Sequence, residues 1–193
     1  GSYLSKVVSV MGSAYKRHTY ILKRSLIELL KDRSDLIVLE DTKFYINNQT
    51  DRLIEHNFNK PEIILTKEVD YVEDGRLITI DLITYNKNTN LINSYIIKRG
   101  NGMYDGGTKK LLMKDILSSK VLLKSFSKFK NFNANKTMSN IIFYYGKRSI
   151  PKPFSLIRDD LDEHFNFAVR ENIEKVNEYF KLSLIKMTNE YRD

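Results

Sequence analysis

The chain has 193 residues, 41% of them hydrophobic, and a formal net charge of +8 at pH 7. This length and this hydrophobic content are enough to bury a core, so we expect a single domain spanning residues 1–193. The absence of cysteine excludes disulfides, thiolate zinc sites and cysteine nucleophiles, and favours a reducing, cytoplasmic setting. No apolar run approaches the roughly 18 residues that span a membrane, so no membrane partner is expected.

Apolar residues at mostly helical spacing predict a helix over residues 14–33, the first element of the chain. Residues 35–46 predict a strand, interrupted near Asp41, and residues 62–72 predict a second strand. The polar stretch between these strands predicts a loop, with one helical turn at residues 51–56.

Residues 76–85 and 90–99 predict a β-hairpin. Both segments are rich in β-branched residues, and they flank the four-residue turn sequence NKNT. The glycine-rich sequence GNGMYDGG (100–107) follows, and Thr108 is the expected N-cap of a helix that ends near Phe129. Because the glycine-rich sequence lacks the GKS/T of a Walker motif, we interpret it as a turn able to approach a nucleic-acid backbone.

The last part of the chain predicts a buried strand and a long helical region. The apolar run 139–146, closed by glycine, is typical of a strand buried on both faces. Residues 155–191 predict the helical region. A hairpin, a crossover helix and a further strand together predict an α/β fold, with a mixed central β-sheet flanked by helices. Gly1-Ser2 is typical of a cloning remnant, so we expect the chain to be a piece of a longer protein.

Positive charge is distributed unevenly along the chain. Residues 98–148 carry twelve Lys/Arg and two acids, whereas residues 35–97 carry six Lys/Arg and eleven acids. Such a basic stretch is typical of a protein that binds a polyanion. The alternative is that an AT-rich genome, indicated by the many Asn, Lys and Ile residues, places lysine on solvated faces. Of the two, we favour nucleic acid as the partner.

The order of elements and three residues on it resemble the PD-(D/E)xK nuclease superfamily, which has the restriction-endonuclease-like fold. Asp81 lies in the middle of the first hairpin strand, and Lys98 shares a face of the second strand with Ile96. In that family a helix glutamate, a strand aspartate and a (D/E)-x-K motif form the active site of an αβββαβ core. The resemblance covers residues 14–146. It implies that Glu28 and Asp81 hold Mg²⁺ and that Lys98 assists catalysis.

The chain departs from the family at the motif acid, where Ile96 replaces a carboxylate, and at Ile80, which replaces a proline. Hydrolysis of a phosphodiester with Mg²⁺ needs carboxylates that hold the ion, so that the ion lowers the pKa of a bound water. Two carboxylates provide fewer ligands for Mg²⁺ than three do, so either another acid completes the site or the site is inactive. The candidate third acids are Glu68, Asp70, Asp105 and Asp115.

Each site residue also has an interpretation without catalysis. Asp81 shares a strand face with Thr79 and can simply face solvent, and Lys98 can be a strand-end lysine that reaches water. Glu28 follows Arg24 by four residues and can form an ordinary helix-surface pair. The function is therefore either that of a Mg²⁺-dependent deoxyribonuclease, or that of an inactive domain on the same fold that binds nucleic acid or a protein partner.

The expected nucleic-acid contacts run from the hairpin into the basic helix. They are Lys98, Arg99, Lys109, Lys110 and Lys114. Contacts of this kind supply affinity and salt dependence rather than sequence preference. Duplex DNA is the expected partner, and the family resemblance adds a homodimer as a further expectation. His18, His56 and His164 show no metal-ligand spacing, and Tyr144 and Tyr145 are expected in the core.

Overall fold

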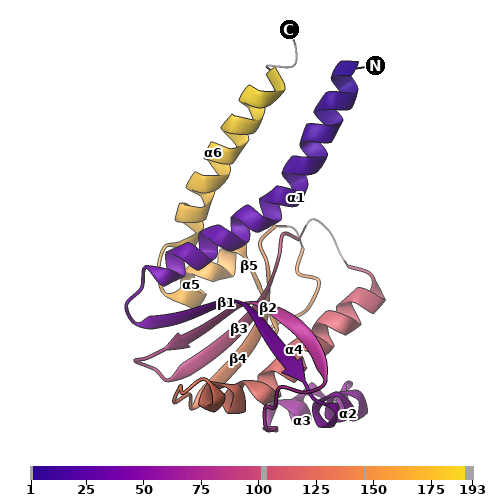
Figure 1. Ribbon diagram of the computed structural model, residues 1–193, viewed down its shortest axis with the longest axis vertical. Helices are drawn as coiled ribbons and strands as arrows, with labels where there is room; N and C mark the ends of the chain where they lie inside the picture. Colours follow the sequence, from indigo (N-terminus) through magenta and orange to yellow (C-terminus); the bar gives the residue numbers. More distant parts are fainter. Residues whose placement is uncertain (1, 101–103, 146, 190–193) are drawn as a thin grey trace.

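The computed structural model describes residues 2–100, 104–145 and 147–189 (Figure 1). Its elements, in chain order, are α1 (Ser2–Lys31), β1 (Leu36–Ile46), α2 (Asn48–Asn57), α3 (Pro61–Leu65), β2 (Arg76–Asn86), β3 (Leu91–Lys98), α4 (Gly106–Phe129), β4 (Lys136–Phe143), β5 (Ser155–Ile157), η1 (Arg158–Asp160), α5 (Leu161–Phe165) and α6 (Val169–Asn189). The strands form one sheet in the order β1-β2-β3-β4-β5. The first three strands are antiparallel, and β3, β4 and β5 are parallel. The predicted α/β fold, a mixed sheet flanked by helices with a C-terminal helical region, is confirmed.

The strand predicted over residues 62–72 is wrong. This segment contains the short helix α3 and then an irregular stretch. The irregular stretch is held by α4 rather than by a neighbouring strand: Val69 N–H donates to the Val121 carbonyl at 3.0 Å, and Tyr71 N–H donates to Ser125 Oγ at 2.9 Å. Burial of Val69 and Tyr71 therefore explains their strand-like spacing without a place in the sheet.

The basic helix was predicted with the wrong N-cap. Asp105, and not Thr108, caps α4: its carboxylate accepts a hydrogen bond from Thr108 N–H at 2.9 Å and one from the Thr108 hydroxyl at 2.7 Å. The predicted region 155–191 contains α5 and α6 but begins with the strand β5. Parts of three predicted segments, residues 101–103, 146 and 190–191, lie outside the described residues.

Helices cover both faces of the sheet (Figure 1). Helix α4 packs on one face, where Leu117 and Phe126 meet Ile96 and Ile141 in one buried cluster. Helix α1 packs on the other face, where its buried side chains and those of strand residues form a second cluster. That second cluster includes Leu22, Leu26, Ile27, Leu30, Leu82, Tyr95, Ile97 and Ile142. The side of the sheet to which a strand residue points is therefore given by the cluster it joins.

Strands β1 and β2 bend together at Asp41 and Asp81, which lie opposite each other. Their register runs from Leu36↔Asn86 to Ile46↔Arg76 and omits a pair only where Asp41 lies opposite Asp81. On β2, Ile80 on one side of this level and Ile83 on the other both join the α4-side cluster, so the alternation of faces shifts between them. Asp41 has a φ of 45°. The bend turns both aspartates toward α1.

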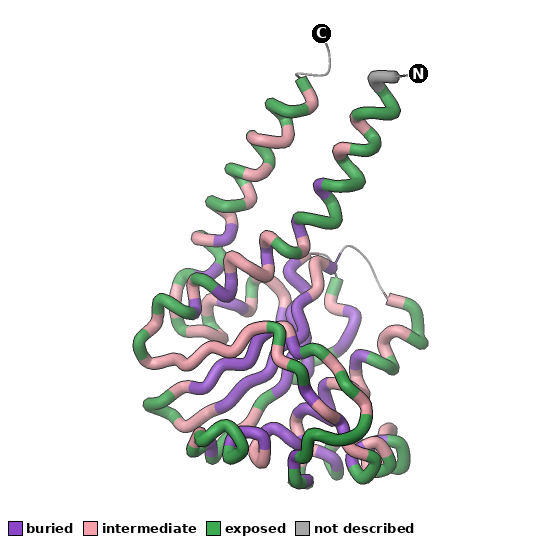
Figure 2. The backbone as a smooth tube through the Cα atoms, viewed as in Figure 1, coloured by how far each residue is buried: buried purple, intermediate pink, exposed green. Residues whose placement is uncertain are grey.

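Beyond the sheet, α1 and α6 project as two helices that run in opposite directions and bring the chain ends to one side of the molecule (Figure 1). Ala14 and His18 are buried on the inner side of this pair, whereas most of the projecting part is exposed (Figure 2). The His18 ring stacks on Phe180 at 5.3 Å. No helix in the described part of the chain has both the length and the apolar content needed to cross a membrane.

Candidate functional site

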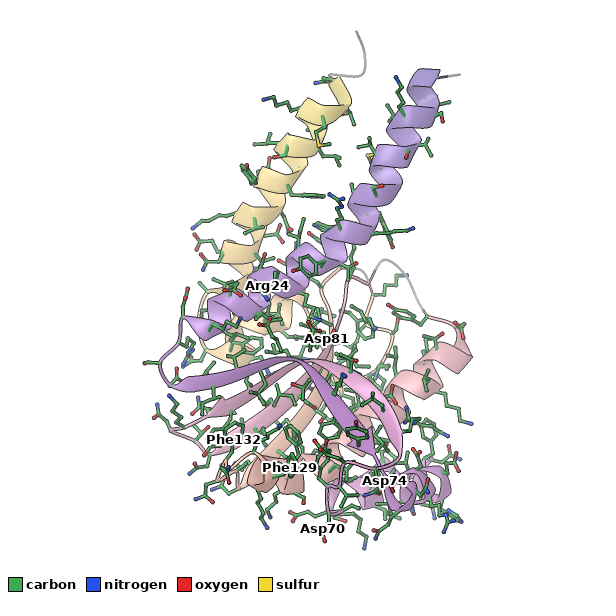
Figure 3. All side chains as sticks on the ribbon, viewed as in Figure 1. Arg24, Asp70, Asp74, Asp81, Phe129 and Phe132 are labelled. Carbon is green, nitrogen blue, oxygen red and sulfur yellow. The ribbon has the colours of Figure 1, made fainter. Side chains whose placement is uncertain are left out.

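Asp81 lies where β2 and β3 separate, beneath α1 (Figure 3). Cross-strand pairing of the hairpin ends at Leu82↔Tyr95. Beyond this pair, a side chain takes the place of a backbone acceptor: Asp81 Oδ2 accepts a hydrogen bond from Ile97 N–H at 2.7 Å. Its Oδ1 accepts one from Lys23 Nζ at 2.9 Å, and the side chain is 20% exposed. Both oxygens of the predicted metal ligand therefore have protein donors.

The Lys23 ammonium joins Asp81 to Asp41. It forms ion pairs with both carboxylates and is 16% exposed. Burial lowers the pKa of Lys23, but the hydrogen bonds to Asp41 and Asp81 outweigh burial, and the pKa lies above its ordinary value. The ammonium is therefore charged at neutral pH, and it occupies the space between two carboxylates from adjacent strands.

Neither Lys23 nor the role of Asp41 was predicted from the sequence. Lys23 precedes Leu26 by three residues and Ile27 by four, which places it on the buried side of its helix. A cation on the inner face of an amphipathic helix needs a carboxylate opposite, and this signal was available. The interruption predicted near Asp41 pointed to the right position without identifying its partner.

Glu28 belongs to a surface network on α1 and not to the Asp81 site. It pairs with Arg24 at 2.5 Å and with Lys31 at 3.2 Å, and its side chain is 54% exposed. Arg24 and Lys31 also pair with Glu40 on β1. The helix-surface pair between Arg24 and Glu28, one of the two interpretations of the sequence, is present.

Lys98 faces the opposite side of the sheet from Asp81. It pairs in register with Phe143, which belongs to the buried cluster on the α4 side of the sheet. Ile96, two residues before Lys98 on the same strand, points to that same face. Burial raises the pKa of Asp115 on α4, and the charges of Arg76 and Lys98 act against this rise, which places Lys98 near Asp115. Asp81, Glu28 and Lys98 are thus not brought together.

The candidate third acids have other roles. Glu68 pairs with Lys124 at 2.7 Å, Asp105 caps α4, and Asp115 accepts a hydrogen bond from Arg76 at 2.9 Å. Asp70 lies at the lower end of the molecule, whereas Asp81 lies near its middle, beneath α1 (Figure 3). Within residues 2–100, 104–145 and 147–189, no group of three or more Asp, Glu, His or Cys side chains is placed to hold a metal ion. The described residues do not form the Mg²⁺ site that the family resemblance implies.

Acidic residues from the segment 35–97 neutralise part of the positive charge of α4. Lys114 pairs with Glu55 on α2 at 2.9 Å, as Lys124 does with Glu68. Lys109 and Lys110, at the start of α4, have no ion pair with any residue that the structure describes. The charge asymmetry of the sequence is therefore partly neutralised within the fold, and the first turn of α4 keeps its positive charge.

Arg99 lies just beyond β3 and is held by side chains from α1. Its Nε donates a hydrogen bond to His18 Nδ1 at 3.0 Å, and its guanidinium lies 4.5 Å from the ring centre of Tyr15. Because Nδ1 accepts, His18 is the neutral tautomer with a proton on Nε2, which donates to Asn177 Oδ1 at 3.1 Å. His18 therefore links the end of the sheet to both projecting helices, although the sequence assigned it nothing.

We expect the free energy of unfolding to fall as the pH drops below neutrality. Burial lowers the pKa of His18 and of His164 in the folded chain. The unfolded chain binds these protons more strongly, so the full stability is present above the ordinary histidine pKa of about 6.5 and declines below it. Urea unfolding at about pH 7.5 and about pH 5.5 measures the effect. The variant carrying His18→Gln and His164→Gln should lose most of the difference; equal wild-type stability at both pH values would contradict the expectation.

Comparisons of the chain with models of protein families, with curated proteins and with solved structures gave no match. The function is therefore inferred from the geometry of the chain itself.

Proposed function

We propose that the chain is a catalytically inactive domain on a nuclease-like scaffold and that it binds nucleic acid, with duplex DNA as the first candidate. Apart from the short helices α2 and α3 inserted between β1 and β2, the order α1, β1, β2, β3, α4, β4 supports the scaffold, because it is the αβββαβ order of the PD-(D/E)xK superfamily. The parallel pairing of β3 with β4 across the α4 connection supports it further.

The observation that favours binding over catalysis is the contact between Lys23 and Asp81. A catalytic Mg²⁺ needs carboxylate oxygens that are open to it and positions for bound water. The Asp81 oxygens instead meet an ammonium at 2.9 Å and a backbone N–H at 2.7 Å. An ammonium neutralises the carboxylates, but it offers no coordination position to water. With Lys98 on the other face of the sheet, this arrangement supports a binding role.

The cations left without acid partners support nucleic acid as the ligand. These cations are Lys109 and Lys110 near the start of α4, which form no ion pair within the part of the chain that the structure describes. Neutralisation of phosphates by such cations supplies affinity that does not depend on sequence. A protein partner with an acidic surface remains the alternative, and it differs from DNA in its response to salt.

The variant carrying Lys109→Gln and Lys110→Gln should bind a short labelled duplex about tenfold more weakly at low salt, with a shallower salt dependence, because two phosphate contacts are lost. The matched control carries Lys114→Gln and Lys124→Gln. It removes the same charge from the same helix, but these lysines are already paired with Glu55 and Glu68, so its loss should be smaller.

Fluorescence anisotropy across a salt series measures both effects. Equal losses from the two variants would show that only the net charge matters and would contradict the assigned surface. If the wild-type chain shows no duplex binding at low salt, the proposed function is wrong.

A further inference from the structure

A pocket of about 390 Å³ opens where β3 and β4 end, between α1 and α6. In open α/β sheets, ligands bind beyond the carboxyl ends of parallel strands, and β3 and β4 are such a pair. The residues that follow these strands, Arg99 and Tyr145, line the pocket with side chains from both projecting helices. The pocket lies apart from Asp81 and belongs to no part of the expected nuclease motif.

The pocket is lined by a series of planar groups. The His18 ring stacks on Phe180 at 5.3 Å and on Tyr145 at 5.6 Å, with interplanar angles of 22° and 20°. The Arg99 guanidinium continues the series, 5.4 Å from the ring centre of Tyr145 and 4.5 Å from that of Tyr15. Faces of this kind attract another flat π-system, because every nucleobase can stack on them.

Hydrogen bonds hold these groups in place. His18 accepts from Arg99 and donates to Asn177, and the Asn177 amide donates to the Tyr145 hydroxyl at 2.7 Å. The chain of bonds ties β3, β4, α1 and α6 together. The lining is thus organised before any ligand arrives, which lowers the entropy cost of binding.

The charges at the pocket select the class of ligand. Arg99 and Lys181 are cations at its lining, suited to a phosphate. Two carboxylates also line it: Glu174 accepts from the Tyr144 hydroxyl at 2.9 Å, and Glu178 lies 3.3 Å from Lys181. Carboxylates accept hydrogen bonds from the amino groups of bases. A flat aromatic group joined to one phosphate meets all of these features.

We propose that this pocket binds a single unpaired nucleotide, with its base among the rings of Tyr15 and Phe180 and its phosphate beside Arg99. Two sources share this chemistry: a free nucleoside monophosphate, and the unpaired end of a nucleic acid. We assign the second, an assignment that rests on the proposed function. The domain then prefers DNA ends with an overhang to blunt duplexes.

The test compares duplexes of one sequence with a blunt end, a 5′ overhang and a 3′ overhang by fluorescence anisotropy. One stacked base is worth a preference of about tenfold for an overhang over the blunt end. Tyr15→Leu should abolish the preference, measured as the ratio of the affinities for overhanging and blunt duplexes. The matched control is Tyr20→Leu, because Tyr20 lies on the same helix, is similarly exposed (63% against 51% for Tyr15) and does not line the pocket.

The outcomes separate the two proposals. Equal affinity for blunt and overhanging duplexes, or a preference that survives Tyr15→Leu, overturns the pocket and leaves the proposed duplex binding intact. If no DNA binds at low salt, the proposed function fails, and titration of dAMP by NMR tests the pocket alone. In that case dAMP binding that Tyr15→Leu removes and Tyr20→Leu retains supports a nucleotide site for free ligand, and its absence overturns the site.

Discussion

Lys23→Met should lower the free energy of unfolding by about 2–3 kcal/mol, between the costs of breaking exposed and buried ion pairs. The variant keeps most of the side-chain volume but removes the ammonium from between Asp41 and Asp81. Asp81 is mostly buried beneath α1, so its carboxylate would lose a charged donor that water replaces poorly. The two aspartates would then repel each other across adjacent strands. Urea unfolding followed by circular dichroism measures the loss.

Two further variants make this expectation specific. Lys16→Met makes the same replacement on an exposed part of α1 and should cost well under 1 kcal/mol. Adding Asp81→Asn to Lys23→Met should recover part of the stability, because an amide is neutral and its oxygen can still accept from Ile97 N–H. If Lys23→Met costs no more than Lys16→Met, the ammonium does not hold the two strands as described.

Gly100→Ala should destabilise the chain by at least about 2 kcal/mol, through backbone strain and overpacking. Gly100 follows Arg99 at a φ of 71°, in the left-handed region that favours glycine. A Cβ at this position would lie 2.4 Å from the Tyr145 carbonyl oxygen. That carbonyl cannot move freely, because the N–H of the same residue donates to the Arg99 carbonyl at 2.6 Å. The substitution would therefore also displace Arg99 from its contacts.

Gly106→Ala is the matched control for this prediction. Gly106 begins α4, and a Cβ there would meet nothing within 4 Å. Alanine also reduces the freedom of the unfolded chain, so the variant should be unchanged or up to about 1 kcal/mol more stable. Thermal or urea unfolding of both variants decides the matter. Similar stabilities of the two alanine variants would show that the close approach of Gly100 to Tyr145 is not real.

The sequence predicted those helices and strands whose spacing of apolar residues fits only one kind of element. The hairpin of β2 and β3 and the helix α4 occur where expected, because β-branched segments around a short turn and an apolar stripe at helical spacing each indicate one kind of element. The pattern of residues 62–72 was misleading, because burial of alternate residues against a helix looks the same as burial in a sheet. Val69 shows this, since its backbone N–H pairs with α4.

The candidate site could not be predicted, for a reason that lies in the bend at Asp81. The shared face of Ile96 and Lys98 follows from strand alternation and is correct. If β2 continued regularly beyond Leu82, which pairs with Tyr95, Asp81 would lie opposite Ile96 on that same face. The bend instead turns Asp81 to the other face, where Lys23 binds it. In the sequence the shift appears only as the adjacent apolar residues Leu82 and Ile83, which a strand buried on both faces also contains.

Electrophoresis of a labelled duplex with the chain, at low salt and with Mg²⁺, tests the central claim most directly, because one gel shows both binding and cleavage. An inactive domain that binds DNA should shift the duplex and leave it intact, and Asp81→Ala should do the same provided that it folds. Cleavage by the wild-type chain that requires Mg²⁺ and is lost in folded Asp81→Ala would contradict the inactive site. A duplex that is neither shifted nor cut would contradict the binding.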